Sequence, residues 1–170
     1  MSPPRAATER YDAARHDVSQ FQSGNETLDR WLLRCAGQSE RRDAARTFVL
    51  TDRGVVIGYY ALLAGELEHT QATEQTRKGL SRHYPIPVAI LARLAVDHRH
   101  QNQGLGATLL RDALRRATLA SEQLAIRAVV VHAIDESAAH FCEHFGFRAL
   151  SATPRTVMVT LAELRAAGYP

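Results

Sequence analysis

Residues 88–96 constrain the fold more than any other segment, because they are apolar without interruption except at Arg93. A central strand that is covered on both faces of its sheet has this composition. A polar turn containing Gly104 and Gly106 follows, and then a helix begins with apolar side chains at helical spacing on one side. These side chains are Leu109, Leu110, Ala113, Leu114 and Ala117. A buried strand that leads into an amphipathic helix indicates an α/β or α+β domain.

Shorter patterns on both sides of this segment predict the other elements. Leu28, Trp31, Leu32 and Cys35 recur at intervals of three and four residues, which is typical of an amphipathic helix. Residues 23–26 can cap the start of that helix. We expect a further helix at 135–144, a polar loop or loose helix at 66–87, an edge strand within 1–22, and strands at 47–50, 55–60, 125–131 and 156–161.

The composition excludes several classes of protein. The chain has 170 residues, which suits one domain, and its 45% hydrophobic content excludes intrinsic disorder. No apolar run approaches the roughly 18 residues that a membrane span requires, and the first residues lack the apolar core of a signal peptide. Cys35 and Cys142 match no zinc or disulfide spacing, which favours a reducing compartment. We therefore expect a single domain over 1–170, in the cytoplasm and without a membrane partner.

Arginine dominates the basic residues, since Lys78 is the only lysine among 21 basic residues. The net charge of +3 is compatible with a polyanionic partner, and the guanidinium group binds phosphate through two parallel hydrogen bonds. A GC-rich genome would produce the same bias, so the composition leaves both explanations open.

The turn between the strand and the helix has the chemistry of a phosphate site. The first backbone N–H groups of a helix have no intrahelical acceptor and carry the positive end of the helix dipole. Because Gly104 and Gly106 have no side chains, a diphosphate can approach these amides closely. The turn lacks the lysine of a P-loop and the full glycine pattern of a dinucleotide site, and alone it also fits an ordinary connection between strand and helix.

Two motifs, in this order, resemble those of the GNAT acetyltransferase superfamily. The first, Gln-x-x-Gly-x-Gly at 101–106, follows the strand end at 94–97 and resembles the acyl-coenzyme A motif of the family. The second, at 129–147, ends in Phe-Cys-x-x-x-Gly-Phe and is similar to the later strand and helix of the family. The resemblance implies the GNAT fold, a mixed central sheet of about six to seven strands with a splay between its two central strands and with flanking helices.

Further segments are similar to one branch of this family, the GNAT toxins of bacterial toxin–antitoxin pairs, which acetylate the amino group of aminoacyl-tRNA. These segments are 23–25, 28–32, 58–62, 85–87 and 91–97, and the similarity extends from about 21 to 161. The resemblance implies an acetyl-CoA-dependent enzyme that blocks translation, forms a homodimer and is neutralised by a ribbon-helix-helix antitoxin. Two alternatives stay open: a GNAT enzyme for a small or peptide amine, and a pseudoenzyme that binds coenzyme A without turnover.

The resemblance also implies which residues bind acetyl-CoA. The strand backbone would pair with the pantetheine arm at Leu94, Ala95 and Val96. The diphosphate would bind backbone amides of the turn, at Gln101, Asn102, Gln103, Gly104, Leu105, Gly106 and Ala107. Asp135, Ala138 and Phe141 would line the adenine and pantetheine side, although capping and packing of their own helix would explain Ala138 and Phe141 at least equally well.

Cys142 departs from the family pattern, because the resembling toxins carry a tyrosine there that supplies a proton to the departing coenzyme A thiolate. An unperturbed thiol is acidic enough, with a pKa of about 8.5 against about 10 for tyrosine. Its sulfur, however, lies a whole ring closer to Cβ than a tyrosine hydroxyl. Cys142 therefore acts through a water, or Tyr59 or Tyr60 replaces it, or the protein is slow or inactive. A covalent role for Cys142 lacks an evident base, and a small buried helix cysteine is the plain alternative.

The acceptor chemistry favours an α-amine. An amine must be neutral to attack a thioester, and α-amino groups titrate at about 7.7–8.0 whereas lysine titrates at about 10.4. An amino acid esterified to tRNA titrates lower still, because the ester withdraws electrons. Such a substrate needs little help from a general base.

By analogy with the toxins, Arg77, Lys78, Arg82 and Arg93 are the candidates for contacts with tRNA phosphates. The alternative is a solvated loop and one salt-bridged strand arginine. His140 and His144 are spaced like a metal-binding pair, but the pattern is not His-Glu-x-x-His, so we expect no metal site.

Overall fold

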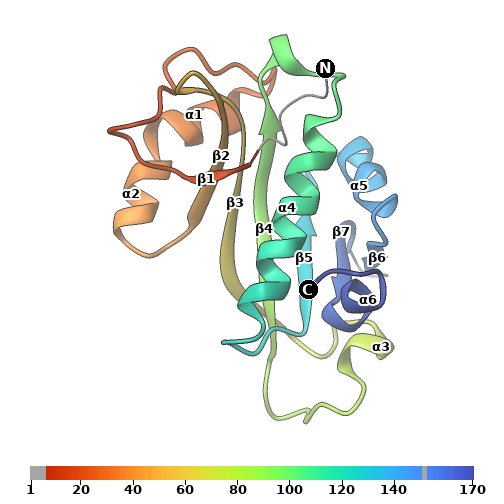
Figure 1. The fold of residues 1–170 in the computed structure, drawn as a ribbon. Helices are drawn as coiled ribbons and strands as arrows, with labels where there is room; N and C mark the ends of the chain where they lie inside the picture. Colours follow the sequence, from red (N-terminus) through yellow and green to blue (C-terminus); the bar gives the residue numbers. More distant parts are fainter. Residues whose placement is uncertain (1–6, 151–152) are drawn as a thin grey trace. The chain divides into compact units, whose positions relative to one another are not determined.

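The computed structural model describes residues 7–150 and 153–170. The chain, drawn as a ribbon in Figure 1, divides into two compact units. Unit 1 comprises the chain up to Leu63 together with Ala92–Ala113, and unit 2 comprises Ala64–Leu91 together with Leu114–Pro170. No helix among the described residues is long and apolar enough to cross a membrane.

The strands form a mixed sheet of seven strands in the order β1-β2-β3-β4-β5-β7-β6. The strands are β1 (Glu9–Arg10), β2 (Arg46–Asp52), β3 (Val55–Leu67), β4 (Ile86–Val96), β5 (Ala128–His132), β6 (Arg148–Leu150) and β7 (Thr153–Thr160). The helices are α1 (Glu26–Arg34), α2 (Ala36–Arg41), α3 (Glu74–Arg77), the 3₁₀ turn η1 (His98–His100), α4 (Leu105–Ala120), α5 (Glu136–Glu143) and α6 (Leu161–Ala166). The predicted α/β class and strand number are confirmed, whereas the splay stays a prediction.

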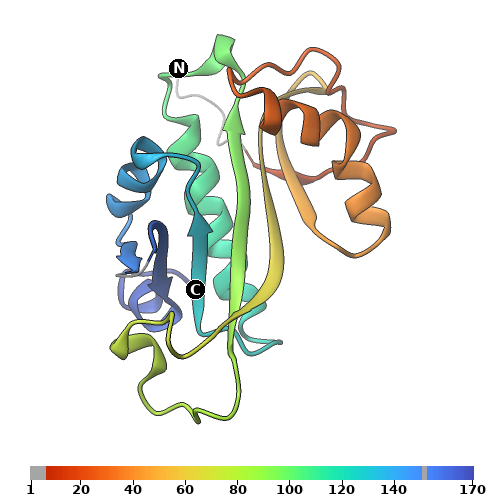
Figure 2. The ribbon, with the colours of Figure 1, turned by 180° about the vertical axis from the view of Figure 1, so that it is seen from behind.

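Unit 1 is built on the hairpin of β2 and β3, which pair antiparallel from Arg46↔Leu62 to Asp52↔Val55. The edge strand β1 adds to β2, as expected of the N-terminal segment. Asn25 caps α1 by accepting the amide of Leu28, and α1 and α2 pack beside the hairpin (Figure 2). The buried core between them is Phe21, Leu32, Ala36, Val49, Val56, Tyr59 and Ala95.

Unit 2 is built on β5, which pairs in parallel with β4 at Val88↔Ala128 to Leu91↔Val131 and antiparallel with β7. Its core is formed by Leu67, Ala72, Ile86, Val88, Ala128, Val130, Leu150 and Met158. The polar segment predicted at 66–87 contains the end of β3, the single turn α3, a loop and the start of β4.

Several boundaries differ from the sequence prediction. The strand expected at 156–161 ends at Thr160, because Thr160 and Glu163 form a reciprocal capping box that starts the unpredicted helix α6. The short β6 and η1 were also not expected. Strand β5 begins at Ala128 rather than at 125, and α4 begins at Leu105, ahead of Gly106. The five apolar side chains predicted on one side of α4 are all at most 2% exposed.

Candidate functional site

The predicted phosphate turn lies in unit 1, between the end of β4 and the start of α4. Gly104 adopts a left-handed backbone with φ +79°, which lets the chain reverse into the helix. Thr108 donates the first backbone hydrogen bond of α4, to Gly104 O at 3.1 Å. The amides of Leu105, Gly106 and Ala107 therefore precede the intrahelical ladder and lie at the positive end of the helix dipole.

The space over this turn is open. A Cβ built on Gly104 meets no atom within 4 Å, so the backbone there is directly accessible. Helix amides without intrahelical acceptors beside a glycine fit the diphosphate of an acyl-CoA. The turn brings together all the predicted diphosphate residues from Gln101 to Ala107.

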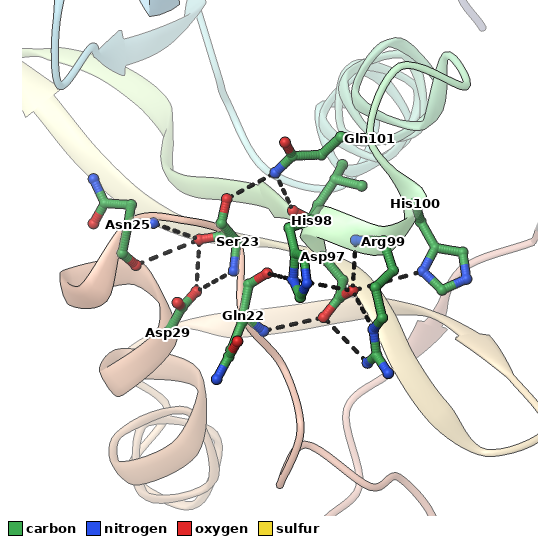
Figure 3. Close-up of polar contacts among 10 residues, drawn as sticks. Gln22, Ser23, Asn25, Asp29, Asp97, His98, Arg99, His100 and Gln101 are labelled. Atoms are coloured by element: carbon green, nitrogen blue, oxygen red, sulfur yellow. Dashed lines mark hydrogen bonds and ion pairs between the residues drawn. The ribbon is translucent and has the colours of Figure 1, made fainter.

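Asp97 anchors the turn through hydrogen bonds of its buried carboxylate (Figure 3). Its side chain is completely buried and accepts hydrogen bonds from the Gln22 amide at 3.0 Å and from the Arg99 guanidinium at 2.9 Å. Burial alone would raise the pKa of Asp97, but the hydrogen bonds from the Arg99 side chain and from the Gln22 and Arg99 amides outweigh it and lower the pKa to about 2. Asp97 is therefore an ionised structural anchor at neutral pH.

Gln101 connects the turn to the segment that precedes α1 (Figure 3). Its Nε2 donates to Ser23 O at 2.7 Å and to Val96 O at 2.9 Å. Ser23 in turn donates its amide and hydroxyl to the carboxylate of Asp29 in α1. The side chain of Gln101 thus holds the turn in place, which leaves its backbone amide for the predicted diphosphate contact. Sequence reasoning did not find Ser23 as the partner of Gln101, Asp29 as the partner of Ser23 or Gln22 as the partner of Asp97.

The predicted pantetheine strand is the end of β4, also in unit 1. Ala95 is buried, whereas Leu94 and Val96 are half-buried. The next amide, that of Asp97, donates to Ile57 O at 2.8 Å, so the strand end is tied to β3.

The three predicted contacts for the adenine and pantetheine side lie on α5 or at its start, in unit 2. Asp135 is exposed and caps α5, because its Oδ1 accepts the Ala138 amide at 2.8 Å. Phe141 is half-buried and packs against Phe145 with ring centroids 5.3 Å apart. Capping and packing are thus present for Asp135 and Phe141, and their contact with a ligand stays a prediction.

Cys142 lies on α5 with a side chain only 5% exposed. Burial, with a smaller contribution from the Glu143 charge, raises the pKa of the Cys142 thiol to about 11. Burial thus moves the pKa of Cys142 above that of an unperturbed thiol. At neutral pH the thiol stays protonated, and it is not an activated nucleophile.

The two tyrosines considered as replacements for the missing phenol are in unit 1 and fully buried. The Tyr59 hydroxyl donates to Leu28 O at 2.6 Å, and burial raises its pKa. The Tyr60 hydroxyl donates to the carboxylate of Asp112. Both hydroxyl protons already hold the fold of unit 1 together, so neither tyrosine is a spare proton donor.

Three of the four predicted tRNA contacts, Arg77, Lys78 and Arg82, are exposed in the connection between β3 and β4 in unit 2, with Arg77 at the end of α3. Arg127, which sequence reasoning missed, supports this loop: its Nε donates to Thr76 O at 2.9 Å and its Nη2 to Lys78 O at 2.8 Å. The fourth, Arg93, lies on β4 in unit 1. The salt bridge considered for Arg93 is absent among the described residues, and its guanidinium instead lies over the Trp31 ring, 4.4 Å from the centroid.

The predicted histidine pair lies at the end of α5, with His140 on the helix and His144 directly after it. His140 Nδ1 lies 3.2 Å from a Glu143 carboxylate oxygen, and its ring meets that of His144 edge to face. In the part of the chain that the structure describes, no group of three or more metal-ligating side chains comes together.

Known proteins are similar to this chain in sequence and in fold. A family model for the acetyltransferase (GNAT) domain matches residues 43–149. The chain is 37% identical over 150 residues to the tRNA-acetylating toxin of Mycobacterium tuberculosis (strain ATCC 25618 / H37Rv), covering 88% of this chain and 89% of that protein.

Two solved structures have the same fold over nearly the whole chain. The structure of AtaT complexed with acetyl-methionyl-tRNAfMet superposes with a TM-score of 0.86 at 27% identity, covering 95% of this chain and 98% of that one. A tyrosine-to-phenylalanine mutant of the AtaT toxin, bound to the C-terminus of the antitoxin AtaR and acetyl-CoA, superposes with a TM-score of 0.81 at 26% identity, covering 96% and 98%. The chain belongs to the GNAT acetyltransferase family.

Proposed function

We propose that this protein is an acetyl-CoA-dependent N-acetyltransferase toxin that acetylates the α-amino group of aminoacyl-tRNA and so blocks translation. The observation that carries the proposal is the 37% identity, over 88% of the chain, to a protein named tRNA-acetylating toxin. The open amide turn before α4 supports it, because that turn has the chemistry of a diphosphate site.

The chain's own residues bind and orient the donor. Amides from Gln101 to Ala107 hold the diphosphate, and the backbone of Leu94–Val96 aligns the pantetheine arm. Asp97 and the Gln101 side chain keep the turn in its binding conformation through their hydrogen bonds to Gln22, Ser23 and Val96. When bound, acetyl-CoA supplies an acyl thioester that an amine can attack.

The acceptor attacks as a neutral amine. An aminoacyl ester is largely unprotonated at neutral pH, so the chain needs to position the amine rather than remove a proton from it. The basic loop with Arg77, Lys78 and Arg82, together with Arg93, contacts tRNA phosphates without reading bases.

The partners are proposed by analogy with the toxins that the chain resembles. AtaT is described with an acetylated tRNA and with the antitoxin AtaR. We infer for this chain an antitoxin of the ribbon-helix-helix type, a homodimer and a place in the cytoplasm.

The test mixes the protein with labelled acetyl-CoA and a tRNA pool that is either charged or deacylated. We expect label on charged tRNA alone. Label on free amines, with indifference to tRNA, would instead support a small-amine enzyme. Tight coenzyme A binding without any transfer would support a pseudoenzyme, the reading that the buried Cys142 thiol favours.

A further inference from the structure

The backbone of the turn before α4 is held by other segments rather than by hydrogen bonds of its own amides. Among residues 7–150 and 153–170, none of the backbone amides from 101 to 107 donates a hydrogen bond to the protein. Asn102 and Gly104 both have a left-handed backbone, with φ +63° and +79°, and residues with a side chain seldom adopt this conformation. The arrangement of these open amides therefore depends on contacts with other segments.

Gln101 makes such a contact through its side chain. Its Nε2 donates to Val96 O, at the end of β4, and to Ser23 O, in the segment before α1 (Figure 3). Because an amide nitrogen has two hydrogens, both of its donor positions are used. No other side chain from 101 to 107 forms a hydrogen bond with another segment of the described chain. The position of the Ser23 carbonyl therefore helps to set the position of the turn.

Asp29 fixes Ser23 in turn. Its Oδ1 accepts the Ser23 amide at 2.9 Å and the Ser23 hydroxyl at 2.6 Å. Hydrogen bonds to a carboxylate are stronger than those between neutral groups. The cap of α1 does not need this contact, because Asn25 Oδ1 already accepts the Leu28 amide. The carboxylate of Asp29 thus ties α1 to the residue whose carbonyl holds Gln101.

We propose that Asp29 is a positioning residue for the diphosphate of acetyl-CoA, and that it acts through Ser23 and Gln101 without touching the ligand. This inference rests on the donor site of the proposed function and adds a residue of α1 to it. While Asp29 holds Ser23, the turn presents its amides in the binding arrangement before the ligand arrives. Without Asp29, the turn would become ordered only on binding, and this ordering would weaken the affinity.

Asp29→Ala should weaken the binding of coenzyme A about three- to tenfold in calorimetry, since it removes the acceptor of both Ser23 bonds. The KM for acetyl-CoA should rise by a similar factor. The kcat should stay within about twofold of the parent, because an ordered turn binds the donor equally in the ground state and in the transition state. Asp29→Asn keeps an acceptor oxygen and should recover most of the affinity.

Asn25→Ala is the matched control. It removes the cap of the same helix, where Asn25 Oδ1 lies 3.1 Å from Leu28 N, and leaves both bonds between Ser23 and Asp29 in place. It should be less stable in urea unfolding and should bind coenzyme A like the parent. An equal loss of affinity in Asn25→Ala and Asp29→Ala would show that any weakening of α1 lowers the affinity, which would overturn the proposal.

A double-mutant cycle shows whether Asp29 acts through Gln101. Gln101→Ala keeps the backbone of the turn and removes the bond to Ser23 O. In that background, Asp29→Ala should change the affinity less than about twofold, because the connection from α1 to the turn is already broken. Equal losses in both backgrounds, or parent-like affinity of Asp29→Ala, would overturn the proposal. If circular dichroism shows that Asp29→Ala does not fold, Ser23→Ala removes the hydroxyl bond alone; it should bind about two- to threefold more weakly, and parent-like affinity would equally overturn the proposal.

Binding and transfer report on different parts of the proposed function. A parent protein that binds coenzyme A but acetylates no charged tRNA would contradict the proposed acceptor, while the calorimetry still decides the role of Asp29. A parent protein that binds no coenzyme A would overturn the donor site and this inference together.

Discussion

Cys142 stands at the position where the resemblance to the toxins predicts a tyrosine. Its thiol is buried and stays protonated at neutral pH, so it carries a proton but lies closer to the helix backbone than a phenol hydroxyl would. The missing phenol rather than the acidity of the thiol is therefore expected to limit turnover.

Replacement of Cys142 by tyrosine should raise the transfer rate by about tenfold or more, because a positioned general acid contributes at least that much. The larger ring should also cost about 1–3 kcal/mol of unfolding free energy in this buried site. Single-turnover kinetics and urea unfolding measure the two effects. Cys142→Ala is the control and should transfer acetyl groups at the parent rate; a large loss in Cys142→Ala would show that the thiol itself supplies the proton.

The lowered pKa of Asp97 predicts that the stability of the fold depends on pH. Its folded pKa of about 2 is lower than the ordinary 3.8, so its stabilisation is complete above about pH 4 and is lost as the pH falls towards 2. Asp97→Asn should therefore be less stable than the parent at neutral pH, and the difference in unfolding free energy should shrink between pH 4 and pH 2. A difference that does not vary with pH would contradict the assignment of an ionised anchor.

At the scale of elements, patterns that are local in sequence predicted the structure best. The 88–96 strand, the turn and the apolar face of α4 appear as expected, because spacing and glycine placement depend on near neighbours. The elements that were missed, β6, η1 and α6, are each a turn or a few residues long and form through pairing and capping. The partners of Gln101 and Arg93 were also not predictable, since Ser23 and Trp31 come from distant segments.

The turn before α4 can be tested with a pair of glycine substitutions. Gly104→Ala should weaken coenzyme A binding at least about tenfold, because its Cβ would stand where the diphosphate approaches the amides. Gly79→Ala is matched in strain, since Gly79 has φ +78° and equally open surroundings. Both should lose about 1 kcal/mol of stability, and only the first should lose affinity in calorimetry. Equal affinities would remove the turn as the diphosphate site.

Two substitutions of Asp135, at the start of α5, distinguish its capping role from a role in ligand binding. Asp135→Ala should cost about 1 kcal/mol in urea unfolding, because the Ala138 amide loses its acceptor. Asp135→Asn keeps an oxygen there and should retain most of the stability and bind coenzyme A within about twofold of the parent. A stable Asp135→Asn protein that binds coenzyme A weakly would instead assign a direct contact to the carboxylate.

At the scale of the whole molecule, the family and the fold class predicted from two motifs are confirmed by the family match and the seven-stranded sheet. The single domain over 1–170 stays a prediction. The path of the chain supports the prediction of a single domain, because β3, β4 and α4 each contribute residues to both units without a break.

This continuity predicts one cooperative unfolding transition. Trp31 fluorescence reports on unit 1, and far-UV circular dichroism reports on the helices and strands of both units. The two signals should change at the same urea concentration. An earlier or later fluorescence transition would show that the units unfold separately.

Lys78 is exposed, which bears on how far acetyl-CoA can acetylate the enzyme itself. Guanidinium groups stay protonated in proteins and do not capture activated acyl groups, whereas an ammonium side chain can deprotonate and do so. Because Lys78 is the only lysine of the chain, it offers the only side-chain amine for self-modification. The arginines that would attract a polyanion therefore keep their charge through repeated catalytic cycles.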